Sequence, residues 1–236
     1  MGLNYFMIEE TSSLDFGVII SDAAVFNAPE RAYEAINVPG RNGAVLFDEG
    51  YYKNITVTYE AAMLNKNTSL DGFRSWLMSF TGYVRLEDTY HPEEYRLAVV
   101  NNGLSVSTEL ANKVGRFTVS FDCKPQRFLK SGEISTRYEA STTIFNPTHY
   151  ASKPLIRVYG HGLLGVGNDT ITVASNPLDY IDIDCDICDA YCGAANANGY
   201  ISLSGTDYPT LEAGATGLTL GDNISAVEVS PRWWTL

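Results

Sequence analysis

Apolar and polar residues alternate along several short stretches of the chain. The segments 55–60 (ITVTYE) and 117–123 (FTVSFDC) place an apolar side chain at every second position. A period of two is typical of a strand with one buried and one solvated face, as in antiparallel sheets. We therefore predict a strand in each of these segments.

The second half of the chain carries the same pattern in shorter pieces. Residues 124–153 are rich in charges, hydroxyl groups and prolines and show no clear period. They are followed by LIRVYG, TITVAS, YIDIDCDI, YISLSG, GLTLG and AVEVS, with glycine, asparagine and proline between them. This spacing is typical of a β-sandwich. The pattern predicts a mainly β protein with two domains, residues 1–130 and residues 131–236.

Only one segment has the period of a helix. In TSLDGFRSWLMSF, residues 68–80, the apolar side chains form a single stripe, made by Leu70, Phe73, Trp76, Leu77 and Phe80. Thr68 and Asp71 have the spacing of a capping box, in which each side chain satisfies a backbone N–H at the start of the helix. We predict one helix, in the first domain.

The segment NVPGRNG, residues 37–43, lies between two runs that are predicted to be strands. Pro39 and Gly40 suit the central positions of a type II turn, and Asn42 and Gly43 suit a type I′ hairpin turn. Arg41 is therefore held between two pieces of fixed backbone. Two interpretations are equally supported by spacing. Arg41 pairs within the chain with Glu34, Asp48 or Glu49, or it anchors the carboxylates of another chain.

The composition limits the partners of the chain. Of its 236 residues, 45% are hydrophobic and 19% charged, and the formal net charge is -12. An acidic surface repels phosphate, so we exclude a reader of DNA or RNA sequence, but not a protein through which DNA passes. The first residues do not form a signal peptide, and no apolar run is long enough to cross a bilayer. We expect no membrane insertion.

Three cysteines at the segment IDIDCDICDAYC, residues 181–192, are the strongest candidates for metal ligands. Cys185 and Cys188 form a CxxC pair, and Cys192 follows. The alternation over residues 181–187 predicts a strand, along which residues three apart point to opposite faces. Asp186 and Ile187 are poor turn residues, so we predict that the two thiols diverge and that the chain binds no metal.

No catalytic motif is found elsewhere in the sequence. His91, in HPEEY, is expected in a solvated acidic loop before a strand. Nucleotide-binding loops, the nucleophile elbow and the zinc-protease motif are all missing from the sequence. We therefore predict that the protein is not an enzyme and has no cofactor.

The order of several segments resembles the distal tail protein (Dit) family of long-tailed phages, the siphophages. The most specific matches are VPGRNG at 38–43 and the strand that ends in FTVSFDCKP at 117–125. The others that fall in the same order are FGVIISDAAVF (16–26), FRSWL (73–77), YVRLEDTYHPEEYRLAVV (83–100), NPTHYASKPLIRVYG (146–160), IDIDCDICDAY (181–191), YPTLEAGATGL (208–218) and VEVSPRWW (227–234). Together they span nearly the whole chain.

The resemblance implies a structural virion protein that forms a hexameric ring at the tip of the tail. Its first domain, a β-sandwich with one helix, would build the ring, and the lumen would continue the DNA channel. Its second domain would be a galectin-like β-sandwich, with the last residues packed back on the first domain. The implied partners are the tail tube protein, the tail-associated protein and receptor-binding or baseplate proteins. Such proteins are made and assembled in the host cytoplasm.

In a ring, the segment Pro39, Gly40, Arg41, Asn42 and Gly43 is expected to form an interface between subunits. A closed ring repeats one contact, and a rigid charged turn would fix its register. The alternative function is carbohydrate binding by the galectin-like half. That half lacks a polar cluster around a central tryptophan, because Trp233 and Trp234 lie near the end of the chain.

Overall fold

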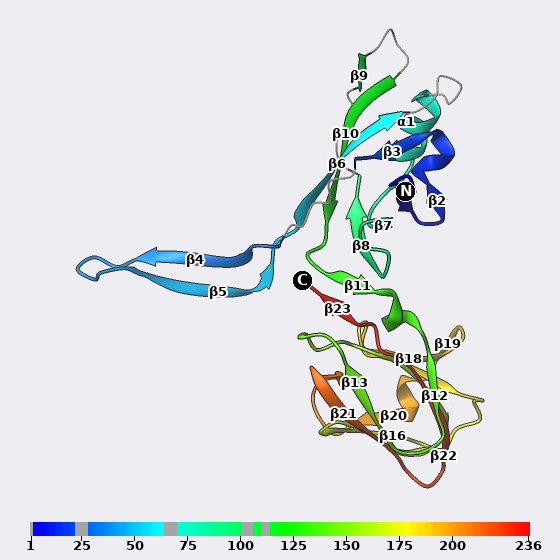
Figure 1. Cartoon of the computed structure of the whole chain (residues 1–236). Coiled ribbons are helices and arrows are strands. Elements are labelled where there is room, and N and C mark those ends of the chain that lie inside the picture. Colours follow the sequence, from blue (N-terminus) through cyan, green and yellow to red (C-terminus); the bar gives the residue numbers. More distant parts are fainter. Residues whose placement is uncertain (1, 22–27, 64–69, 101–105, 110–113) are drawn as a thin grey trace. The chain divides into compact units, whose positions relative to one another are not determined.

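The computed structural model describes the chain except for residues 1, 22–27, 64–69, 101–105 and 110–113. The chain forms two compact units, one of Met1–Arg127 with Leu236 and one of Phe128–Thr235. Strands dominate both units, and α1 (Leu70–Met78) is the single α-helix of the described residues (Figure 1). The predicted mainly β fold with one helix is confirmed.

In the first unit, antiparallel strands form a sheet in the order β2-β1-β7-β8-β10-β6-β3, and β9 pairs with β10. The strands are β1 (Phe6–Ile8), β2 (Thr11–Ser12), β3 (Val18–Ile20), β6 (Ile55–Met63), β7 (Val84–Asp88), β8 (Glu94–Val99), β9 (Val106–Glu109) and β10 (Val114–Cys123). A short 3₁₀ helix, η1 (Ser13–Phe16), joins β2 to β3. The two strands predicted from alternation lie within β6 and β10, which pair along their whole length.

The helix covers an aromatic core in this unit. Phe73 and Leu77 are fully buried, and Phe6 meets Phe121 and Phe73 edge to face. Leu70, Trp76 and Phe80 pack on the same core, as the predicted stripe requires. The helix is shorter at its C-terminal end than the predicted range, and Thr68 of the predicted capping box lies outside the described residues.

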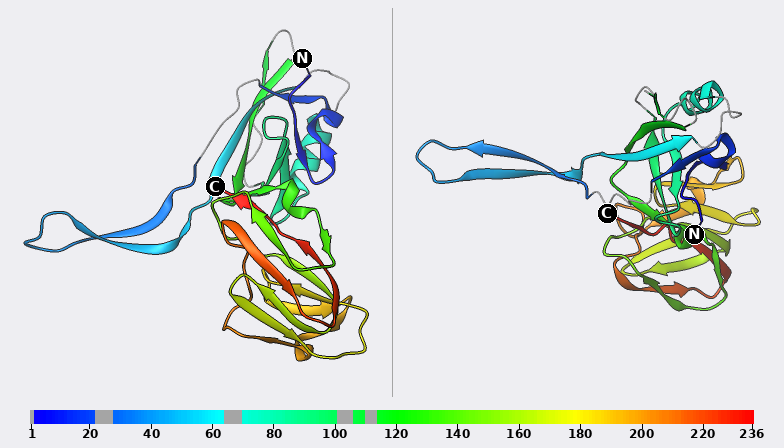
Figure 2. Two further views of the ribbon diagram at one scale, coloured as in Figure 1. Left: turned by 60° about the horizontal axis from the view of Figure 1, so that its bottom comes forward. Right: turned by 45° about the horizontal axis from the view of Figure 1, so that its top comes forward.

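The strands β4 (Arg31–Asn37) and β5 (Ala44–Tyr52) form a separate two-stranded sheet. They run antiparallel as a long ribbon (Figure 2). The pairing shifts register between Arg31 and Tyr33, opposite the segment of β5 that contains Gly50 with φ +79°. Both strands that the sequence predicts on either side of residues 37–43 are confirmed.

The second unit is a β-sandwich. One sheet has the order β12-β22-β14-β17-β18-β19 and the other β13-β21-β15-β16-β20. Apolar side chains from both sheets meet in one core, among them Ile156, Leu164, Ile183 and Leu218. Its strands are β12 (Thr136–Tyr138), β13 (Thr142–Asn146), β14 (Leu155–Gly160), β15 (Gly162–Val166), β16 (Asp169–Val173), β17 (Ile181–Asp184), β18 (Asp189–Cys192), β19 (Ala195–Asn196), β20 (Ile201–Leu203), β21 (Gly214–Leu220) and β22 (Ile224–Ser230).

The ends of the second unit are fixed by close backbone contacts. The 3₁₀ helix η2 (Lys130–Glu133) lies against the segment before β23 (Trp234–Thr235), and a side chain at Gly132 would clash with the backbone nitrogen of Trp233. The unit begins at Phe128, within β11 (Arg127–Leu129), and the Leu129 N–H donates to the Trp233 carbonyl. A further 3₁₀ helix, η3 (Asn198–Tyr200), precedes β20. Leu236 belongs to the first unit, where its main-chain oxygen accepts from Arg127 Nη2 at 2.6 Å.

Candidate interaction site

The β4–β5 hairpin exposes apolar side chains on both of its faces. Cross-strand register puts Tyr33 and Leu46 on one face and Ile36 and Phe47 on the other, because successive strand residues alternate. These side chains are between 46% and 66% exposed. Among the described strands, β4 and β5 pair only with each other, and an isolated two-stranded hairpin is marginally stable in water. Exposed apolar side chains gathered on one element make the hairpin a candidate interaction surface.

The tip of the hairpin is a rigid loop of residues 38–43. The Arg41 N–H donates to the Val38 carbonyl at 3.1 Å, and Gly40 has φ +81°. Both features are those of a type II turn, as predicted. The predicted type I′ turn is wrong. Only Gly43 of the pair has a positive φ, and the last cross-strand pair is Asn37 with Ala44, so the connection is longer than two residues.

Arg41 makes no ion pair with any residue that the structure describes, and its side chain is exposed. Two of the three predicted intrachain partners are engaged elsewhere. Asp48 accepts from Arg31 Nε at 2.8 Å and from the Gly50 N–H at 2.8 Å, and these two contacts lower its pKa, the Gly50 bond more. Glu49 hydrogen-bonds Tyr51, which raises the pKa of Tyr51.

The CxxC segment does contain a turn, contrary to the prediction. β17 ends at Asp184, residues 185–188 reverse the chain, and β18 begins at Asp189. Cys188 takes a positive φ of 56°, and Asp184 Oδ1 accepts from the Asp186 N–H at 3.0 Å. The side chain of Asp184 thus stabilises a turn that the residue types of Asp186 and Ile187 do not predict.

The cysteines differ in environment. Cys185 is buried, and burial, followed by the charge of Asp184, raises its pKa to about 12. Cys188 is exposed and Cys192 is half-buried. Outside the segments that are left undescribed, no group of three or more histidine, cysteine, aspartate or glutamate side chains is placed to hold a metal ion. A buried neutral thiol is a poor ligand and a poor nucleophile.

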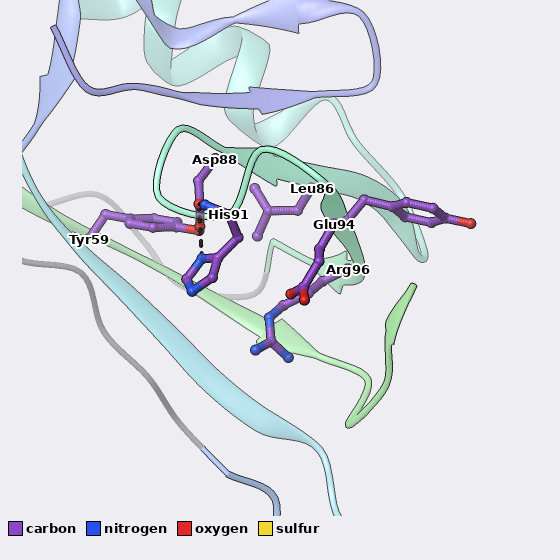
Figure 3. Close-up of a pocket in the computed structure, with 7 residues that line it drawn as sticks. Tyr59, Leu86, Asp88, His91, Glu94 and Arg96 are labelled. Carbon is purple, nitrogen blue, oxygen red and sulfur yellow. Dashed lines mark hydrogen bonds and ion pairs between the residues drawn. The ribbon is translucent and has the colours of Figure 1, made fainter. Parts of the chain in front are cut away.

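The titratable groups around His91 have a structural role. Asp88 accepts from Tyr59 Oη at 2.7 Å and from the Tyr90 and His91 N–H groups at 2.9 and 2.8 Å, and it lies 3.1 Å from His91 Nδ1 (Figure 3). It therefore closes the predicted loop between β7 and β8. Burial, followed by the charge of Asp88, raises the pKa of Tyr59 well above its ordinary value.

The cavity beside this cluster is too small for a substrate. Its volume is ≈ 10 Å³, about that of one water molecule. Arg96 faces it from β8, and its buried Nη1 has no hydrogen bond to any described residue. One ordered water would satisfy that group. The described residues here offer positions for neither a substrate nor an activated nucleophile.

The tryptophans of the second unit are committed to packing. Trp233 is buried, and Trp234 stacks on Tyr150 with ring centroids 4.5 Å apart. Trp234 Nε1 also donates to the Ala151 carbonyl at 3.0 Å. Sugar binding by stacking requires an open aromatic face. The buried Trp233 offers none, and Tyr150 covers one face of Trp234.

The turn residues of the sequence predict the tip of the hairpin as a site, but its sides were not predicted. Ala44–Phe47 is an uninterrupted apolar run, and such a run in a strand signals that both faces are to be covered. That signal pointed to Leu46 and Phe47, which are among the most exposed apolar residues of the chain. No helix of the described residues has the length and apolar character to span a membrane.

No family model matches the sequence, and no curated protein matches it. Among solved structures, the chain is similar to the SPP1 Dit protein (gp 19.1), described as a paradigm of the hub adsorption apparatus in phages that infect Gram-positive bacteria. The TM-score is 0.76, with 13% identity over 100% of both chains. A chain of the phage p2 baseplate, in its activated conformation with Sr, is similar over 97% of this chain and 98% of that chain, with a TM-score of 0.51 and 11% identity. Along its whole length, this chain has the fold of SPP1 Dit.

Proposed function

We propose that this chain is a structural protein of a phage tail tip, the distal tail protein, without catalytic activity. The observation that carries the proposal is the match to SPP1 Dit over 100% of both chains at a TM-score of 0.76. A likeness that spans both units supports the same architecture rather than one shared module. A structural role also agrees with the two groups of titratable side chains described above. The residues around His91 and the segment 185–188 contribute to packing and to turns.

The ring is proposed to contain six copies, joined by the β4–β5 hairpin. In a closed ring, one surface of each subunit contacts a different surface of its neighbour. The exposed apolar faces that contain Leu46 and Phe47 would be covered by the neighbouring copy. Arg41, at a fixed turn and without a described intrachain ion pair, would meet a carboxylate there. Pro39, Gly40, Asn42 and Gly43 hold its backbone in place.

The remaining partners follow from the same proposal. One face of the ring would meet the tail tube protein and the other the tail-associated protein, while receptor-binding or baseplate proteins would dock on the galectin-like second unit. A net charge of -12 suits a lumen that passes DNA without retaining it. The protein would be made in the host cytoplasm and end at the tip of the virion tail.

Light scattering on a sizing column, with negative-stain images, tests the ring. We expect a six-subunit particle with a central hole, in isolation or after addition of the tail tube protein. A monomer under both conditions would contradict the proposal. A glycan array serves as the parallel test of carbohydrate binding, and specific binding there would favour that function instead.

A further inference from the structure

A groove of ≈ 340 Å³ opens in the second unit between β12 and β13. These strands follow each other along the chain but belong to different sheets of the sandwich. The side chains that line it include Ile134, Thr136, Tyr138, Thr143, Phe145 and Trp233. None of the described residues lining it is charged. Ile134 and Phe145, 65% and 69% exposed, are large apolar side chains open to solvent.

Both strands beside the groove have one unpaired edge. β12 pairs with β22 and β13 with β21, and neither pairs with a second strand in the described part of the chain. An unpaired edge presents backbone N–H and C=O groups at the spacing of a strand. Such an edge is a template for another extended chain.

β13 lacks the features that normally block an exposed edge. Its sequence, Thr142–Asn146, contains no lysine and no proline, and its register with β21 is unbroken by a bulge. Its inward polar residue, Asn146, is satisfied by the Tyr150 and Leu211 carbonyls rather than left to repel a partner. The strand therefore remains open to pairing.

The uncharged lining of the groove and the unpaired backbone edge of β13 together indicate the kind of ligand that the groove binds. In a chain of net charge -12, a lining without any charge complements an uncharged ligand rather than an ionic one. The free backbone edge requires a ligand with its own row of N–H and C=O groups. An extended peptide meets both requirements, because strand addition takes affinity from the main chain and specificity from alternate side chains.

We propose that this groove binds an extended, uncharged segment of another tail protein, which adds as a strand to the free edge of β13. Alternate apolar side chains of that segment enter the groove. The identity of the partner as a tail protein rests on the proposed function. The binding surface itself rests on the groove and the edge of β13.

The full-length protein can be tested with a short capped peptide that alternates valine and threonine. A peptide with prolines in place of the valines, which cannot form the ladder, is the control. At about 1 mM peptide, we expect slower hydrogen exchange at residues 142–146 with the first peptide alone. Unchanged exchange in β13, or protection confined to other strands, overturns the proposal.

Two variants locate the binding site. Phe145→Lys places a charge on the groove, and Leu163→Lys places one on β15 of the same sheet, where Leu163 is 56% exposed. Phe145→Lys should weaken peptide binding about tenfold, and Leu163→Lys should leave it unchanged, with both variants melting like wild type. Equal effects of the two variants on peptide binding overturn the proposal. A wild-type dimer that is lost in Phe145→Lys also overturns it, by assigning the groove to a second copy of this chain.

The results of the peptide experiment and of the ring experiment are independent of each other. Peptide binding is measured on the second unit of the full chain, whether or not the chain is assembled. A ring without peptide binding would leave the proposed function intact and remove the groove as a docking site. Peptide binding without a ring would remove the tail-protein identity of the partner.

Discussion

Removal of the Arg41 guanidinium tests whether the tip of the hairpin serves assembly. We expect Arg41→Ala to melt like wild type, because the exposed side chain makes no ion pair with a described residue. Ring assembly should suffer, since a truncated anchor costs on the order of 2 kcal/mol at every interface. Melting curves and sizing profiles measure the two effects. An early melt with rings intact would assign Arg41 to its own subunit.

Gly40→Val separates the backbone of the tip from its charge. Gly40 has φ +81°, and an added Cβ would meet nothing within 4 Å, so the cost arises from the backbone conformation alone. We expect strain of about 1–3 kcal/mol, which loosens the hairpin and speeds hydrogen exchange in β4 and β5. Arg41→Ala should leave that exchange unchanged. Identical exchange in both variants would show that the turn does not hold the hairpin.

The ion pair between Asp184 and Arg232 makes the stability of the second unit depend on pH. Arg232 Nη1 and Nη2 donate to the two Asp184 oxygens at 2.6 and 2.8 Å, and this contact is the main cause that lowers the pKa of Asp184. A lowered pKa contributes stability above the unfolded pKa of about 4, and that stability is lost as the pH falls through the folded pKa.

Asp184→Asn should therefore destabilise the protein by about 2–3 kcal/mol near neutral pH, and the difference from wild type should shrink in acid. Urea unfolding at several pH values measures it. Asp186→Asn is the matched control, because Asp186 is 63% exposed and pairs with Lys153 only at 3.7 Å. A difference that stays constant down to acid pH would contradict the role of this ion pair.

At the scale of elements, the hairpin is expected to matter for assembly more than for folding. Phe47→Ser removes an apolar side chain that is 61% exposed in the free chain, so the melting temperature should change little. Ring formation should weaken strongly if a neighbouring copy covers this face. Ile187→Ser, at an equally exposed position in the turn between β17 and β18, is the control. Equal sizing profiles for the two variants would refute the hairpin as the joint.

Elements whose apolar residues recur with a regular period were predictable from the sequence. A turn that is held by a side-chain hydrogen bond was not. The segments that became β6 and β10 alternate along their length, and the helix stripe includes Phe73 and Leu77, so burial followed the period. The turn after β17 carries no glycine or proline. It depends on Asp184, whose side chain caps the turn and binds Arg232, a residue distant in the sequence.

The hairpin shows the same limit for the candidate site. Proline and glycine encode the turn at its tip locally, so Gly40 could be placed in advance. The sides depend on a surface outside the chain. A run such as Ala44–Phe47 has the same composition whether it is buried in the core of its own chain or covered by another chain. Only the structure distinguishes the two, by leaving Leu46 and Phe47 exposed.

At the scale of the whole molecule, the chain is expected to contain no stoichiometric metal. Cys185 is buried with a raised pKa, and no metal-binding group is found among the described residues. Elemental analysis of the purified protein measures this, and treatment with a chelator should leave the melting temperature unchanged. One zinc per chain, or a chain that a chelator unfolds, would contradict the prediction.

The place of β22 in its sheet has a consequence for synthesis on the ribosome. β22 lies between β12 and β14, so the sheet of the second unit stays divided until nearly the last residues of the chain are made. The first unit, apart from Leu236, is complete at Arg127. It can fold on the order of ten seconds earlier at ordinary translation rates. If the hairpin joins subunits as proposed, a chain truncated before Ile224 would still present that hairpin while lacking a finished second unit. On the proposed function, incomplete translation products would then be dominant-negative subunits of the assembly rather than inert fragments.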